Sequence, residues 1–132
     1  MRLRLTRKAD ADIASVLRTT KRLFGRNQLL IYARLINDGL SMIAADPSRS
    51  SCRPHEDLGS GIKSMHLDHV RGRSGSAAHL VFFMQKTAPA GEQEIVVIGV
   101  LHERMVPRRH LAKVLRDVGE EDRQESKPAS RQ

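Results

Sequence analysis

Histidine, carboxylate and basic side chains in this sequence are of the types that acid–base chemistry on a phosphodiester uses. Such a reaction needs a general base for the attacking hydroxyl, a general acid for the leaving oxygen and cations for the charge that builds around phosphorus. His102 could serve as acid or base, and Glu56 as base. Lys63, Arg71 and Arg104 could hold the phosphate. Because these residues fall in separate segments, the sequence leaves open whether they meet.

The histidines and the single cysteine suggest two further kinds of site. The chain has six histidines, but the spacing of His66 and His69 suits metal ligands on a helix better than on the strand expected there. Cys52 stands beside Arg53, which could lower the pKa of the thiol, although a lone loop cysteine is typically inert. A single cysteine also excludes an internal disulfide. We therefore predict neither a metal site nor a cofactor.

A dense basic segment follows the last apolar run of the sequence. It contains Arg104, Met105, Arg108, Arg109 and His110. Cations next to Pro107 would lie at the N-terminal end of a helix, where the helix dipole disfavours them, and this favours a partner-binding role over an ordinary solvated face. Met105 could either contact that partner or fill the core. His102 could instead anchor the turn that leads into the helix.

Composition and charge narrow the class of protein. The chain has 132 residues and a formal net charge of +8 at pH 7, which suits an acidic or polyanionic partner. Aromatic residues make up 3%, which argues against a base-stacking platform for single-stranded nucleic acid. The longest apolar run, residues 95–101, is too short to span a bilayer, and no apolar signal segment follows the basic start. We expect a cytoplasmic protein with no membrane partner.

The first part of the sequence predicts a strand and two helices. Residues 2–6 alternate as in a strand with one buried face, and Thr6 can cap the helix that follows. The apolar stripe of that helix consists of Ala9, Ile13, Val16, Leu17, Thr20, Leu23 and Phe24. Gly25 fits its C-terminal cap, Asn27 fits the next N-cap, and Asp46 with Pro47 ends the second helix. The link between the two helices is two or three residues long, and so short a link predicts an antiparallel helical hairpin.

The rest of the sequence predicts three strands and a last helix. The expected strands are residues 62–67, 79–84 and 94–101, the last of them central in the sheet. Loops are expected at 46–60 and 68–76, and Pro107 begins the helix. The order β-α-α-β-β-β-α predicts an α+β fold in which a helical hairpin covers one face of an antiparallel sheet, with a short C-terminal helix. Residues 1–118 form the expected domain, and 119–132 a disordered polar tail.

Several segments in this order match the motifs of one known family. Residues 5–13 look like its strand followed by a helix rich in Ala and Asp, and residues 43–47 like its closing Leu-x-x-x-Pro. Residues 53–64 are similar to Arg-Pro-x-x-Glu-Leu-x-x-Gly-Leu-Arg-Ser, and 100–111 to Val-Leu-His-x-Arg-Met-x-x-x-x-His-Leu. Over residues 2–115 the chain thus resembles the ParE branch of the RelE/ParE toxin superfamily. It departs from the family in the longer basic loop at 68–76, in Phe83, which stands at the family's tyrosine, and in its acidic tail.

The resemblance implies a toxin of a type II toxin–antitoxin pair that poisons DNA gyrase by binding it and is not an enzyme. It also implies a cognate ParD-like antitoxin that forms a hetero-oligomer with the toxin by laying a helical and an extended segment over the hairpin and sheet. The residues expected to bind gyrase or a gyrase–DNA complex are Lys63, Arg71, Arg73, Arg104, Met105, Arg108, Arg109 and His110. The residues expected to line an antitoxin groove are Leu17, Leu29, Tyr32 and Ile36.

Two alternatives stay open at this point. The sister RelE branch contains toxins that cleave mRNA on the ribosome, and the catalytic candidates His102, Glu56, Lys63, Arg71 and Arg104 would serve that reaction. RelE-type members usually carry basic residues with a tyrosine or histidine near the C-terminus, whereas this chain has no tyrosine after Tyr32. The second alternative is an inactive interaction module with the same fold.

Overall fold

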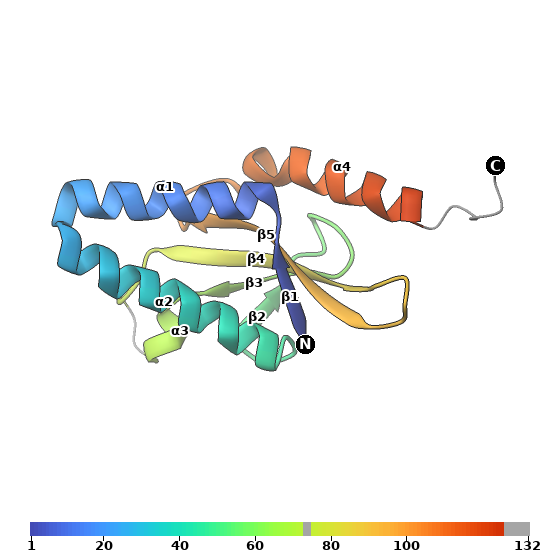
Figure 1. Ribbon diagram of the computed structural model, residues 1–132, viewed down its shortest axis with the longest axis horizontal. Coiled ribbons are helices and arrows are strands. Elements are labelled where there is room, and N and C mark those ends of the chain that lie inside the picture. Colours follow the sequence, from blue (N-terminus) through green and yellow to red (C-terminus); the bar gives the residue numbers. More distant parts are fainter. Residues whose placement is uncertain (73–74, 126–132) are drawn as a thin grey trace.

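A mixed five-stranded sheet of order β1-β5-β4-β3-β2 forms the middle layer of the molecule (Figure 1). The computed structural model describes residues 1–72 and 75–125, with side chains described up to Glu120. The elements are β1 (Arg2–Leu5), α1 (Arg7–Phe24), α2 (Arg26–Ala45), β2 (Cys52–Pro54), β3 (Ile62–His66), α3 (Asp68–Arg71), β4 (His79–Thr87), β5 (Gln93–His102) and α4 (Pro107–Glu125). The predicted α+β class and element order are confirmed, with β2 and α3 added inside the two segments expected to be loops.

Strand β1 corrects the prediction of a fully antiparallel sheet. It pairs with β5 in parallel, with Arg2 opposite Glu94 and Leu5 opposite Val97, whereas all other neighbouring strands are antiparallel. The parallel pairing arises because the chain leaves β1 through the helical hairpin and β1 then pairs only with the last strand. Arg4 donates from Nε to the buried carboxylate of Glu94 at 2.8 Å, which satisfies that charge at the sheet edge.

Thr6 joins β1, α1 and β5, and its predicted role as N-cap is confirmed. The Ala9 amide donates to the Thr6 hydroxyl at 3.1 Å, while that hydroxyl and the Thr6 amide both donate to the Val97 carbonyl, at 2.9 and 3.0 Å. Thr6 is itself buried. A single side chain therefore fixes the angle at which α1 leaves the sheet.

Gly25 alone makes the turn between α1 and α2. Its φ of 90° lies in a region that favours glycine, its amide donates to the Lys21 carbonyl at 2.9 Å, and it is also the N-cap of α2. The prediction that Asn27 caps the second helix is therefore wrong, because α2 has already begun at Arg26. The apolar stripe of α1 ends in Leu23 and Phe24, which are 57% and 71% exposed.

Apolar side chains form a separate core on each face of the sheet. On one face, Met65, Val81, Phe83 and Val97 pack with residues of α1 and α2. On the other, Phe82, Ile98 and Leu101 pack against Leu111, Val114 and Val118 of α4. The hairpin covers its face as predicted, and α4 covers the second face, for which no cover is predicted.

Helix α4 corrects the expected start of the tail. The sequence predicts disorder from Gly119, but α4 continues to Glu125. The buried residue Val118 holds this end of the helix against the sheet, and the next positions are rich in Glu, Arg and Gln, which are good helix formers. The rest of the expected tail, residues 126–132, lies outside the described residues. Among the described residues, no helix is long and apolar enough to cross a membrane.

The Thr6 junction gives a first test of the fold. Thr6→Ala removes the cap of α1 and the side-chain hydrogen bond to Val97, so we expect it to lower the free energy of unfolding by about 1–2 kcal/mol. Thr6→Ser keeps both hydrogen bonds and should retain most of the stability. Thr19→Ala, at an exposed position of the same helix, serves as the control in urea denaturation. Equal effects of Thr6→Ala and Thr19→Ala would contradict the assigned role of Thr6.

Candidate functional site

Three side chains that can exchange protons meet beneath the helical hairpin. The Tyr32 hydroxyl lies 2.6 Å from His79 Nδ1 and accepts the Ala78 amide at 3.2 Å. Because the amide can only donate, we assign the hydroxyl proton to the bond with Nδ1, which places the ring proton of neutral His79 on Nε2. The ring of His79 also contacts that of His102, with centroids 5.3 Å apart in an edge-to-face arrangement.

Burial keeps His79 and Tyr32 uncharged near neutral pH. Desolvation, with a further contribution from the charge of His102, lowers the pKa of His79 to about 4. Desolvation likewise raises the pKa of Tyr32 above its usual value of 10.0. His102 accepts the Arg104 amide at Nδ1 at 3.1 Å, so its ring holds the turn after β5. These contacts are those of a structural network that closes the end of the sheet.

A third histidine, His66, forms a hydrogen bond with a carboxylate at the same end of the sheet. Its Nε2 lies 2.7 Å from Glu103 Oε2, and its Nδ1 accepts the Asp68 amide at 3.0 Å. Nε2 therefore donates to the carboxylate. This hydrogen bond lowers the pKa of Glu103. The hydrogen bond between His66 and Glu103 links β3 to the turn after β5.

The residues considered for RNA cleavage do not converge on one site. His102 lies on the hairpin side of the sheet, where it contacts His79. Glu56 lies in a loop on the α4 side, because the neighbouring His55 packs on Phe82. The remaining candidates are Lys63, Arg71 and Arg104. Lys63 donates to the Pro47 carbonyl at 3.3 Å, and Arg71 lies on α3. Arg104 donates its backbone amide to His102. A general base and a general acid are thus on opposite faces of the sheet.

The turn between β5 and α4 exposes apolar side chains among cations. Met105 and Val106 are 43% and 51% exposed, so the interpretation of Met105 as a core residue is wrong. We define the turn surface as the exposed residues Arg104, Met105, Val106, Arg108, Arg109 and His110. Arg108 reaches the Asp57 carbonyl at 3.2 Å. Sequence reasoning missed Val106. The signal was present in the sequence, because Val106 is apolar, follows Met105 directly and comes just before Pro107, which begins the helix.

The predicted gyrase surface is only partly continuous in the structure. Its members 104, 105 and 108–110 gather on the turn surface. Lys63 is half-buried and held by Pro47, on the hairpin side of the sheet, and Arg71 is exposed on the separate short helix α3. Arg73 lies outside the described residues. The turn surface is therefore the part of the predicted surface that the fold assembles.

The predicted antitoxin groove also needs correction. Tyr32 and Ile36 are buried in the core beneath α2, because they lie on the side of the helix that faces the sheet, while Leu17 and Leu29 are half-buried. The exposed apolar residues are instead at the end of the hairpin. We define the hairpin tip as Leu23, Phe24, Leu30 and Ile31, all strongly exposed. Sequence reasoning placed Leu23 and Phe24 in the apolar stripe of α1 and did not consider Leu30 and Ile31, which belong to α2.

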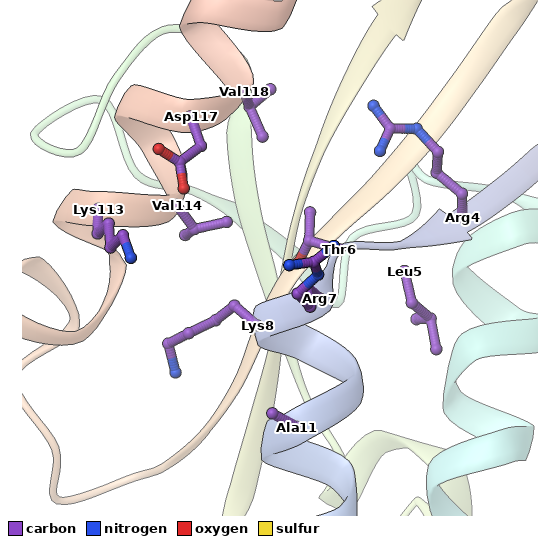
Figure 2. A pocket seen from close by; sticks show the side chains of 10 residues that line it. All are labelled: Arg4, Leu5, Thr6, Arg7, Lys8, Ala11, Lys113, Val114, Asp117 and Val118. Carbon is purple, nitrogen blue, oxygen red and sulfur yellow. The ribbon is translucent and has the colours of Figure 1, made fainter.

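A basic hollow of about 610 Å³ lies where β1 meets α1 and α4 (Figure 2). We call it the junction hollow, and it is lined by Arg4, Leu5, Thr6, Arg7, Lys8, Ala11, Lys113, Val114, Asp117 and Val118. Lys8 is paired with Asp12 at 2.6 Å, as Arg4 is with Glu94. Figure 2 shows Lys113 and Asp117 approaching from α4 and Arg7 and Lys8 from the first turn of α1. The excess of cations suits an anionic group.

Neither a thiol nor a metal cluster adds chemistry to the part of the chain that the structure describes. Cys52 is buried in β2, and burial raises the pKa of its thiol despite the nearby charges of Arg49 and Lys63. The suggestion that Arg53 activates it is therefore wrong. Residues 1–72 and 75–120 contain no group of three or more His, Cys, Asp or Glu side chains placed to hold a metal ion.

The half-buried imidazole of His79 predicts a pH dependence of stability. Its pKa is about 4 in the folded chain and about 6.5 when unfolded, so its contribution is complete above pH 6.5 and is lost as the pH falls towards 4. The full shift corresponds to ~3 kcal/mol, which solvent screening of a half-buried ring reduces to about 1–2 kcal/mol. His79→Gln should lose that much less stability than the wild type over this range. The control His69→Gln, at an exposed position, should lose as much stability as the wild type over this range. If His79→Gln also lost as much as the wild type, burial of the His79 ring would not be the cause of the pH dependence.

Comparisons with known proteins agree with this fold. No protein-family profile matches the chain. The chain is 30% identical over 108 residues to Toxin ParE1 of Caulobacter vibrioides, covering 82% of this chain and 95% of that protein. It is 29% identical over 112 residues to Toxin ParE of Escherichia coli, covering 85% and 94%. Its fold is similar to a chain of the chromosomal ParDE TA system from P. aeruginosa, with a TM-score of 0.60 and 20% identity over 77% of this chain and 95% of that one. The identity to Toxin ParE1 over nearly its whole length confirms the resemblance, and the chain belongs to the ParE toxin family.

Proposed function

We propose that this chain is the toxin of a type II toxin–antitoxin pair, that it acts in the cytoplasm by binding DNA gyrase, and that a ParD-like antitoxin neutralises it. Membership of the ParE toxin family supports the first part of this proposal. The likeness of the fold to a ParDE system supports an antitoxin partner of the ParD type. Gyrase as the target is carried over from the family resemblance, and the chemistry of the turn surface is consistent with it.

The observation that carries binding rather than catalysis is the turn surface. Two exposed apolar side chains, Met105 and Val106, stand among Arg104, Arg108 and Arg109. Met and Arg are enriched in protein–protein interfaces, where an apolar centre is surrounded by a polar rim. The catalytic candidates, in contrast, lie on both faces of the sheet. A docking role therefore fits this site better than acid–base chemistry.

The hairpin tip supports the antitoxin part of the proposal. Exposed apolar side chains on a small protein mark interaction sites when they gather in one place, and Leu23, Phe24, Leu30 and Ile31 are close to Gly25 in the turn. In Figure 1 this turn lies at the left edge of the molecule, at the far end of α1 from β1. An antitoxin helix on the hairpin would cover these residues, and this leaves the turn surface for the target.

Induction in bacterial cells without the antitoxin tests the proposed function. We expect growth arrest, gyrase-dependent DNA breaks and a DNA-damage response, because a gyrase poison stabilises the cleaved complex. Co-expression of the cognate antitoxin should restore growth. mRNA cut at ribosomal A-sites without DNA damage would instead establish a RelE-type nuclease. Harmless induction of the folded chain would leave an inactive interaction module.

A pair of matched double variants tests the assignment of the two surfaces. Met105→Ser with Val106→Ser should weaken binding to gyrase on the order of 10- to 100-fold, because it removes the apolar centre of the turn surface. Leu30→Ser with Ile31→Ser should weaken antitoxin binding by a similar factor and leave gyrase binding unchanged. Affinities of both variants for both partners can be measured by surface plasmon resonance. Equal losses for both partners, or the reverse pattern, would refute the assignment.

A further inference from the structure

The outer side of α1 carries exposed cations. Ser15, Arg18, Thr19 and Arg22 are spaced so that they share one side of the helix, and all are exposed. Arg7 precedes Arg18 by about three helical turns and therefore lies on the same side. Within the described residues, Arg7, Arg18 and Arg22 have no carboxylate partner. We call this side the outer α1 face.

Small side chains separate these cations along the helix. Ala11, Ala14 and Ser15 lie between Arg7 and Arg18, so an extended molecule could approach the helix closely there. The two carboxylates of α1 lie beside this line of cations. Asp12 accepts the Val100 amide at 3.0 Å and pairs with Lys8, whereas Asp10 is exposed, is three residues after Arg7, and borders the face at its N-terminal end. The outer α1 face therefore keeps an excess of positive charge, with small side chains between its cations.

Two hollows open along this helix and lie near its opposite ends. The junction hollow includes Arg7, Lys8 and Ala11, together with Lys113 and a single carboxylate, Asp117, from α4 (Figure 2). The second hollow, of about 590 Å³, is lined by Ser15, Arg18, Thr19, Lys21 and Arg22. A helical rise of 1.5 Å per residue separates Arg7 from Arg22 by about 22 Å. Hydroxyl and guanidinium groups are thus arranged in a line along α1.

We propose that the outer α1 face binds the sugar–phosphate backbone of duplex DNA. Phosphates follow one another at about 3.4 Å per strand along the duplex axis, so ~22 Å of helix spans about six of them. Arg, Lys, Ser and Thr side chains are the usual partners of backbone phosphates. Protein–protein interfaces typically centre on apolar anchors, and most of the exposed large apolar side chains lie at the hairpin tip and the turn surface. In the toxin this contact rests on the proposed function, because it would hold the DNA that gyrase has cleaved.

Binding of the purified chain to a short fluorescent duplex of mixed sequence, without gyrase, tests the proposal. The variant Arg18→Gln with Arg22→Gln should bind on the order of 10-fold more weakly at low salt, and the slope of log affinity against log salt should fall by about 2. Arg34→Gln with Arg116→Gln makes the same charge change at exposed positions of α2 and α4. That control should keep the wild-type slope. Melting curves establish that both variants are folded.

Two outcomes would replace a defined DNA contact on α1 by diffuse charge attraction or by an acidic protein partner. Equal loss of slope in both double variants would show attraction by net charge alone and overturn the proposal. Binding to poly-L-glutamate that depends on Arg18 and Arg22, without binding to the duplex, would assign the face to an acidic protein and also overturn it. Gyrase cleavage assays are independent of this readout. Normal duplex binding without gyrase poisoning would refute the proposed function and leave the DNA contact standing.

Discussion

Burial of β5 on both faces is the constraint on which the rest of the structure depends. Its apolar residues alternate between the hairpin core, which takes Ile95 and Val97, and the α4 core, which takes Val96 and Ile98. Both edges of the strand are also paired, with β1 on one side and β4 on the other. A register shift opposite Phe82 and Phe83 makes Ile98 the extra residue of a bulge. The helices on either side are thus positioned by one strand.

This arrangement leaves the charge of the molecule on its outside. The described buried side chains are almost all apolar, and the buried carboxylate of Glu94 is paired with Arg4. At the end of the sheet, burial keeps His79 neutral, and the hydrogen bond with the Tyr32 hydroxyl satisfies its Nδ1. The net charge of +8 is therefore available to partners. The turn surface combines that charge with exposed apolar side chains, whereas the outer α1 face combines it with small and hydroxylated ones.

Local patterns were sufficient to predict most elements, and they failed where distant parts of the chain meet. Thr6, Gly25 and Pro107 act as local signals, and each marks a helix end as predicted. The parallel pairing of β1 depends on a contact with β5 from the other end of the sequence, and the cover that α4 provides depends on packing that periodicity cannot specify. Asn27 was a plausible cap, but Gly25 completes the turn before it.

Site residues were harder to predict because exposure depends on where each helix overhangs the sheet. Phe24 continues the same apolar stripe as the buried Ala9, yet it is exposed because it lies at the end of the hairpin. Tyr32 and Ile36, by contrast, lie on the side of α2 that faces the sheet and are buried. The basic residues after His102 were recognised from sequence, whereas the separation of Lys63 and Arg71 from them required the fold.

Cleavage of supercoiled plasmid by purified gyrase in the presence of the purified chain tests the central claim most directly. The reaction is stopped with detergent and protease so that protein-linked breaks appear as linear plasmid. We expect linear plasmid to increase with the concentration of the chain, to require gyrase, and to disappear when a ParD-like antitoxin is added first. Unchanged plasmid, with a folded chain that binds the antitoxin but not gyrase, would contradict the proposed poisoning of gyrase.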